Sequence, residues 1–174
     1  MPCSRRRELL LGLLGGLVGA VAPAAAIVPV TPDYADRILV LKRDRLLHLM
    51  QGQTILRTFR VALGRRPLGT KERQGDGRTP EGVYHLEYFK EDSAYHRAIK
   101  ISYPNDEDRQ RARARGADPG GLIMIHGLDP AIGSKWRDSH WMFNWTNGCI
   151  AVTNAEMDVI WSSVAPGIPI EIRP

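Results

Sequence analysis

The sequence has 174 residues, of which 43% are hydrophobic and 25% are charged, and its formal net charge is +5 at pH 7. A chain of this length and composition is expected to form one domain with enough apolar surface for a core. The arginines are dispersed and no aromatic stacking motif accompanies them, so the composition argues against binding to nucleic acid.

The first 26 residues have the pattern of a secretory signal peptide. Residues 5–7 are arginines, residues 9–21 are apolar and rich in glycine, and residues 24–26 are alanines that suit a cleavage site. The arginine pair resembles a twin-arginine signal, although Sec export fits equally well. The strongly apolar part has about 13 residues, whereas ~20 are needed to span a bilayer. We expect cleavage after about Ala26 and an exported domain of residues 27–174, in the periplasm or cell envelope; the alternative is an uncleaved signal that anchors the chain.

Downstream of the signal segment, short apolar runs separated by turns predict a sheet. The runs at 38–41 and 46–50 flank a charged turn and predict a hairpin. In residues 55–63, alternation predicts one buried face. That face would hold Ile55, Phe59, Val61 and Leu63. Residues 64–82 are rich in glycine, proline and charge and predict a long surface loop. Further strands are predicted at residues 83–89, 98–102, 122–125 and 168–172.

Two segments predict helices. Residues 105–116 start with an Asn cap and an acidic first turn and end with arginines and a glycine, an order that suits the helix dipole. They have almost no apolar stripe, so this helix is expected on the surface with its arginines in solvent. Thr153 and Glu156 form a capping box in front of a second, amphipathic helix. The whole pattern predicts a mainly β domain with this second helix packed against it.

The use of cysteine points to a reactive thiol. Cys3 lies in the signal segment, which leaves Cys149 as the one cysteine of the mature domain. A single cysteine in an oxidising compartment indicates either intermolecular pairing or a reactive role. The alternative is an inert cysteine that packs as a small hydrophobic side chain.

The surroundings of Cys149 favour acyl-transfer chemistry. His126 follows an apolar strand and precedes Gly127, which makes it the best-placed general base. Pairing with a histidine can lower the pKa of a thiol from ~8.5 to as little as ~3.5. The consecutive amides of Gly148 and Cys149 lie in a turn and can point at one developing oxyanion.

The other four histidines are weaker candidates. His48, His85 and His96 lie in or beside predicted strands and are expected to be structural. His140 lies between the proposed base and the proposed nucleophile, so it is a candidate for contact with substrate.

Several motifs, in a fixed order, resemble those of one protein family. Residues 125–127 read Ile-His-Gly and residues 146–150 read Thr-Asn-Gly-Cys-Ile, which is similar to the active-site signature of L,D-transpeptidases of the YkuD type. Residues 75–82 resemble the glycine-rich Thr-Pro loop of that family. Residues 101–105 and 145–152 are similar to the branch that contains the YafK-like proteins. The likeness covers most of the mature chain.

The resemblance implies a β-sandwich-like catalytic domain with one or two peripheral helices and no metal or organic cofactor. It implies that Cys149 attacks a carbonyl in a peptidoglycan stem peptide and forms a thioester, which an amine acceptor then resolves. His126 would be the base, the Gly127 carbonyl would orient its ring, and the amides of Gly148 and Cys149 would form the oxyanion hole. The residues expected to contact substrate are Thr146, Asn147, His140 and Trp145. A wall-anchored lipoprotein is a second candidate partner, because YafK-like relatives can release one.

Three departures from the family pattern bear on specificity. Asn147 stands where many members have histidine, and Ala151 stands where many have arginine. An arginine at that position can hold a carboxylate by two hydrogen bonds, so Ala151 leaves recognition of the donor open. In addition, 22 residues separate His126 from Cys149, more than in members with a short loop.

Three alternatives use the same residues differently. With water as the acceptor, the protein would be a peptidoglycan amidase or peptidase. A zinc hydrolase would draw its ligands from His126, Asp138, His140 and Cys149, although the sequence has no H-E-x-x-H or paired-cysteine spacing. A non-catalytic wall-binding module would keep Cys149 buried and inert.

Overall fold

The computed structural model describes residues 34–174. The expected signal segment, residues 1–26, lies outside the described residues. Between residues 34 and 174, no helix is long and apolar enough to cross a membrane.

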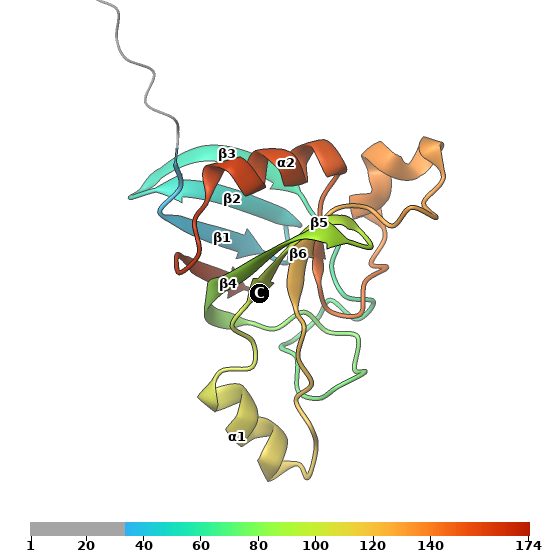
Figure 1. Ribbon diagram of the computed structural model, residues 1–174. Coiled ribbons are helices and arrows are strands. Elements are labelled where there is room, and N and C mark those ends of the chain that lie inside the picture. Colours follow the sequence, from blue (N-terminus) through green and yellow to red (C-terminus); the bar gives the residue numbers. More distant parts are fainter. Residues whose placement is uncertain (1–33) are drawn as a thin grey trace, which may run out of the picture. The chain divides into compact units, whose positions relative to one another are not determined.

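One eight-stranded sheet dominates this part of the chain, in the order β3-β2-β1-β8-β4-β5-β6-β7. The strands are β1 (Arg37–Leu41), β2 (Leu46–Gln51), β3 (Thr54–Arg60), β4 (Gly82–Ser93), β5 (His96–Ile101), β6 (Met124–His126), β7 (Ile150–Ala151) and β8 (Pro169–Arg173). Two α-helices, α1 (Asp106–Ala114) and α2 (Asn154–Ser163), and a 3-10 helix, η1 (Ser134–Met142), complete the fold (Figure 1). The prediction of a mainly β domain is confirmed, whereas η1 was not predicted.

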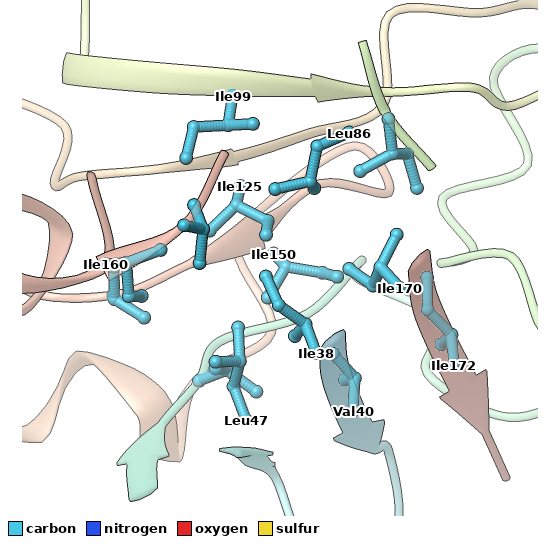
Figure 2. Close-up of a cluster of buried hydrophobic side chains, with 14 of the residues drawn as sticks. Ile38, Val40, Leu47, Leu86, Ile99, Ile125, Ile150, Ile160, Ile170 and Ile172 are labelled. Carbon is cyan, nitrogen blue, oxygen red and sulfur yellow. The ribbon is translucent and has the colours of Figure 1, made fainter. Parts of the chain in front are cut away.

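The long strand β4 joins the two halves of the sheet. Its first residues pair with β8, from Gly82 opposite Ile172 to His85 opposite Pro169. From Leu86 onward it pairs with β5 instead. The two halves enclose an apolar core, and Figure 2 shows side chains of β1, β2 and β8 facing those of β4, β5, β6 and β7. Burial of this core drives the two halves together.

The sheet also closes on itself beyond its two edge strands. After β3, the chain runs on beside β7, where Ala62 and Ala151 exchange two backbone hydrogen bonds of 2.9 Å. The Thr146 amide donates to Leu63 O (3.2 Å), and the Arg65 amide donates to Thr146 O (3.0 Å). The segment that precedes and includes β7 is therefore held by β6 on one side and by residues 62–65 on the other.

The predicted face of residues 55–63 is partly wrong. Phe59, Val61 and Leu63 join the core, but Ile55 is 51% exposed. The register of β2 against β3 jumps from Leu49 opposite Arg57 to Met50 opposite Ile55, so β3 contains one extra residue, a β-bulge. Because side chains alternate along a strand, one extra residue turns Ile55 to the solvent side.

The second predicted helix forms as expected. Thr153 and Glu156 make the reciprocal capping box of α2, and Met157 and Ile160 of this helix are fully buried. Figure 1 shows α2 lying across the sheet, and its position beside β5 and β6 brings the helix N-terminus close to the end of β6.

The first predicted helix is less solvated than expected. Asp108 of α1 is buried, accepts a hydrogen bond from the Tyr84 hydroxyl at 2.9 Å and pairs with Arg111. Burial, and next the charge of Asp108, raise the pKa of Tyr84, so this hydroxyl stays protonated and donates. One arginine of the helix therefore belongs to a buried polar contact and not to a solvated face.

We predict that Asp108→Ala lowers the free energy of unfolding by about 2–3 kcal/mol, because it removes the nearest acceptor of the Tyr84 hydroxyl and of Arg111 and breaks the capping box of α1. The neighbouring Glu107→Ala is the matched control, since the Glu107 side chain is 83% exposed and the Asp108 side chain 0%. Urea unfolding of both variants tests this. Equal midpoints would contradict the role of Asp108.

Candidate active site

Cys149, the candidate nucleophile, lies in a turn whose shape depends on the nearby Thr146. The Thr146 hydroxyl donates to Cys149 O at 2.7 Å and accepts from the Gly148 amide at 3.1 Å. Thr146 is buried, and both of its backbone groups are bonded to residues 63 and 65. We expected Thr146 to contact substrate; in the structure its hydroxyl is instead used within the turn that carries Cys149.

Gly148 is required by its conformation and by its surroundings. Its φ is +124°, and a Cβ at this position would lie 2.5 Å from Arg78 O. The glycine-rich loop therefore packs directly against the backbone next to Cys149. An L-residue with a side chain would strain the turn and displace one of the two segments.

The proposed base is held by the residue that follows it. His126, at the end of β6, is buried, and its Nδ1 lies 2.7 Å from Gly127 O. A carbonyl oxygen only accepts hydrogen bonds, so Nδ1 carries the proton and the neutral ring keeps its lone pair on Nε2. This is the contact that the family resemblance implies for Gly127.

Gly127 has no room for a side chain. A Cβ here would lie 2.6 Å from Asn154 Oδ1 and 2.8 Å from Tyr95 O. The Gly127 amide donates to Tyr95 O (3.0 Å), and the Asn154 side chain accepts from the Leu128 amide (2.9 Å). The carbonyl that orients His126 is thus fixed by the hairpin between β4 and β5 and by the start of α2.

The strand register places Cys149 and His126 on the same face of the sheet. In the parallel pair of β6 and β7, Ile125 is opposite Ile150, and His126 is opposite Ala151. Ile125 and Ile150 point into the core, so His126, Ala151 and Cys149 belong to the other face. Positions two residues along a neighbouring strand are about 8 Å apart, a gap that an imidazole and a thiol together can bridge.

Two aromatic rings flank the imidazole. The ring centroid of Tyr95 lies 4.7 Å from that of His126, and the centroid of Trp145 lies 5.6 Å from it. Tyr95 comes from the β4–β5 hairpin and was not predicted as a site residue. The sequence did not indicate this role, because the contact depends on how far the hairpin extends over β6.

Burial disfavours the charged form of both candidate catalytic groups. Burial raises the pKa of Cys149, which a hydrogen bond from the Met124 amide and the charge of Lys71 only partly offset. Burial lowers the pKa of His126, although the hydrogen bond to Gly127 opposes this shift. The structure therefore favours a thiol beside a neutral imidazole over the preformed thiolate that the Cys-His pairing suggested.

Two cavities lie near these residues. One of about 410 Å³ reaches Cys149 and Asn147, and glycines at positions 75, 120 and 121 form part of its wall. The other, of about 430 Å³, is lined mainly by apolar groups of residues 131–145, among them His140 and Trp145. The four residues predicted to contact substrate are therefore divided: Asn147 lines the first cavity, His140 and Trp145 line the second, and Thr146 lines neither.

His140 is buried in an unusual way. It is 1% exposed, and neither ring nitrogen has a hydrogen-bond partner within residues 34–174. Burial lowers the pKa of His140 to about 4, so the ring is neutral. The Nε1 of Trp145 in the same wall is likewise buried and unpaired among the described residues.

The loop of residues 64–82 differs from its prediction as a surface loop. Lys71, Asp76 and Thr79 are all buried in it. Lys71 Nζ lies 2.9 Å from Asp76 Oδ1, and the Thr79 hydroxyl accepts from the Gly64 amide at 3.0 Å. The loop was expected to be exposed because it has few apolar residues, but its interior contains buried polar side chains that bond to one another and to the backbone.

Two of the remaining three histidines, His48 and His96, have hydrogen-bond partners that fit a structural role. His48 Nδ1 lies 2.8 Å from Thr58 Oγ1, and His96 Nε2 lies 2.8 Å from Asp158 Oδ1. His85 is exposed on β4. In the described part of the chain, no three His, Cys, Asp or Glu side chains are grouped so that they could hold a metal ion.

The fold and the site together define a mainly β domain in which a cysteine and a histidine share one face of the sheet beside a cavity. Residues 35–172 match the family described as YkuD, L,D-transpeptidase catalytic domain. The chain belongs to this family.

Relatives of known name or structure agree with this assignment. The Escherichia coli K12 protein named "Putative L,D-transpeptidase YafK" is 28% identical over 98% of this chain and 71% of its own length. The cell shape determining protein Pgp2 of Campylobacter jejuni superposes with a TM-score of 0.61 at 23% identity, over 79% of this chain and 46% of Pgp2. Bd1075 of Bdellovibrio bacteriovorus gives 0.55 at 21% identity, over 83% and 50%. The chain spans about half the length of these two solved structures, which are similar to it in fold.

We predict that Gly148→Ala destabilises the protein by about 1–3 kcal/mol, because the new Cβ overlaps Arg78 O and the positive φ is strained. Gly133→Ala is the matched control, since a Cβ at that position comes no closer than 3.9 Å to another residue. Thermal unfolding of the two variants separates the effect of packing from a general loss of glycine.

We predict that Cys149 reacts faster with iodoacetamide as the pH is raised, and that the rate still increases at pH 9.0. The ordinary pKa of a cysteine thiol is 9.0, and burial raises the pKa of Cys149 from that value. Only the thiolate reacts, so the rate follows the deprotonated fraction. Mass spectrometry of the peptide that contains Cys149, with a short cysteine peptide as reference, measures it. A plateau below pH 7 would indicate a preformed ion pair and contradict a neutral resting state.

Proposed function

We propose that this protein is a peptidoglycan L,D-transpeptidase that works through a thioester on Cys149. The observation that carries the proposal is the pairing of β6 with β7, which gives the thiol and the imidazole a common face. The hydrogen bond from Nδ1 of His126 to Gly127 O adds a base whose free lone pair is on Nε2.

The first half-reaction is acylation of the cysteine. The Cys149 sulfur attacks the carbonyl carbon that precedes a D-residue of a tetrapeptide stem, while Nε2 of His126 takes the thiol proton. The tetrahedral intermediate collapses, the C–N bond breaks, and the amine of the D-residue leaves with that proton. Neutral resting groups suit this order of steps, because His126 is already unprotonated when the substrate arrives.

The second half-reaction passes the acyl group to an acceptor. A side-chain amine of another stem, or of a wall-anchored lipoprotein, attacks the thioester and gives its proton to Nε2 of His126. The C–S bond then breaks, and His126 returns that proton to the sulfur to restore the thiol. Both half-reactions develop an oxyanion, for which the amides of Gly148 and Cys149 are the proposed donors. The Gly148 amide donates to Thr146 Oγ1 at rest, so it must exchange that partner for the oxyanion.

The proposed substrate contacts follow from the two cavities. Asn147 is exposed at the cavity that reaches Cys149 and is proposed to contact the donor stem. His140 and Trp145 are proposed to contact substrate in the second cavity, which both residues line. Thr146 is proposed to act on substrate only through the turn that it shapes. The reaction belongs in the periplasm or cell envelope, where stem peptides are.

We predict that Cys149→Ala abolishes turnover of defined muropeptides without changing the melting temperature, and that His126→Ala lowers the rate by about 10²–10⁴-fold. Asn147→Ala is the milder comparison, because its backbone is expected to matter more than its side chain. Mass spectrometry of the products measures all three variants. Full activity of Cys149→Ala would disprove the thioester mechanism.

The same products identify the acceptor. Cross-linked dimers indicate an amine acceptor, whereas shortened monomers indicate water and hence a peptidase or amidase. A carbapenem adduct on Cys149 of the native protein, lost in Cys149→Ala, distinguishes an acylating enzyme from a non-catalytic wall-binding module.

A further inference from the structure

The cavity that reaches Cys149 has a single charged side chain in its wall. The described residues that line it are mostly glycines and uncharged side chains, and Lys71 is the exception. Lys71 is only 3% exposed, so its ammonium group is shielded from bulk water at the edge of this cavity. A buried cation beside an open space favours an anion in that space.

The ammonium group of Lys71 has a donor to spare. It donates to Asp76 Oδ1 at 2.9 Å and to Arg73 O at 3.0 Å, and its third N–H has no partner in the described part of the chain. Lys42 provides a contrast within the same protein. That buried lysine uses all three donors, on Gly69 O (2.7 Å), Thr79 O (3.0 Å) and Glu81 Oε1 (2.7 Å).

Asp76 neutralises Lys71 only in part. Its carboxylate also accepts from the amides of Glu72 (2.7 Å), Arg78 (3.0 Å) and Arg73 (3.1 Å). Burial raises the pKa of Asp76, but these hydrogen bonds and that of Lys71 outweigh it, so the pKa is lowered and the group is ionised. Because three amides share its negative charge and Asp76 does not line the cavity, positive potential remains on the Lys71 side.

Ala151, in β7, cannot bind an anion in this way. Ala151 is fully buried, and its amide and carbonyl are both bonded to Ala62. Ala151 therefore offers no free donor to a carboxylate near Cys149.

We infer that Lys71 binds a carboxylate of the substrate in the cavity beside Cys149 and thereby selects stem peptides that carry a free carboxylate near the scissile bond. This inference rests on the proposed function and deepens it by assigning a specificity-determining residue. The third N–H of Lys71 donates to the carboxylate, and its other two donors keep the ammonium in place. Lys71, from the glycine-rich loop, thus supplies the positive charge that an arginine at position 151 would otherwise supply.

Two carboxylates of a stem peptide have this chemistry. One is the terminal carboxylate of the leaving D-residue, and the other belongs to the diamino acid on the acyl side. Two substrates separate them: one amidated at the C-terminus and one amidated on the diamino acid. The carboxylate that Lys71 holds is the one whose amidation raises KM in the native protein but not in Lys71→Gln.

The first test needs no turnover. Cys149 is alkylated with iodoacetate, an anion, and with iodoacetamide, its neutral counterpart, and the ratio of the two rates is measured for each variant. We expect the ratio to fall about five-fold or more in Lys71→Gln, because the local cation is gone. Lys71→Arg keeps the charge and should keep most of the ratio, and Lys42→Gln, the matched buried lysine, should leave it unchanged.

The ratio is internal to each variant, so a change in the accessibility of the thiol affects both reagents alike. Melting temperatures identify a variant that has not folded. If Lys71→Gln is not folded, acetate is added to the native protein as a competitor, and it should slow the reaction with iodoacetate but not the reaction with iodoacetamide. Acetate that slows neither reaction would overturn the inference. An unchanged ratio in folded Lys71→Gln would overturn the inference.

The two proposals fail differently. If no variant turns over muropeptides but the alkylation ratio falls in Lys71→Gln, the proposed transpeptidase function is wrong and the anion site remains. If the native protein is active but neither the ratio nor the preference for free carboxylates depends on Lys71, the function stands and the inference about Lys71 is wrong.

Discussion

The parallel pairing of two very short strands, β6 and β7, is the interaction on which this site depends. The register that opposes Ile125 to Ile150 sends those side chains into the core and leaves His126 and Cys149 on the other face. A shift of one residue would reverse every side chain of β7 and turn Cys149 inward. That shift would be costly, because it would expose core side chains and break the hydrogen bonds to residues 62–65. Contacts at some distance from the thiol therefore fix its orientation.

The site combines a candidate catalytic pair with an environment that disfavours the charged form of both members. Burial disfavours the thiolate and the imidazolium alike, as the raised pKa of Cys149 and the lowered pKa of His126 indicate. Oxidation of cysteine proceeds through the thiolate, so a protonated resting state also protects the sulfur. Lys71 and the Met124 amide then stabilise negative charge locally once the proton has moved.

The sequence predicted most strands, the capping box of α2, and the segments that contain His126 and Cys149, because these features depend on local periodicity and on short motifs. It did not predict the exposure of Ile55, since one extra residue in β3 reverses a pattern without leaving a trace in composition. Buried polar residues were the larger omission. Lys71 and Asp76 looked like solvent-exposed charges, and only the folded loop shows that they are buried and paired with each other. Tyr95 was missed because its contact with His126 depends on the reach of a hairpin.

The hydrogen bonds between residues 62–65 and residues 146–151 connect parts of the chain that are far apart in sequence. Contacts of such large separation form late, since the intervening chain must first be ordered. A growing or unfolded polypeptide therefore contains Cys149 and His126 but lacks the strand pairing that puts them on one face. Assembly of the candidate site is coupled to completion of the whole domain, so a chain that is still being synthesised holds both side chains without the arrangement that joins them.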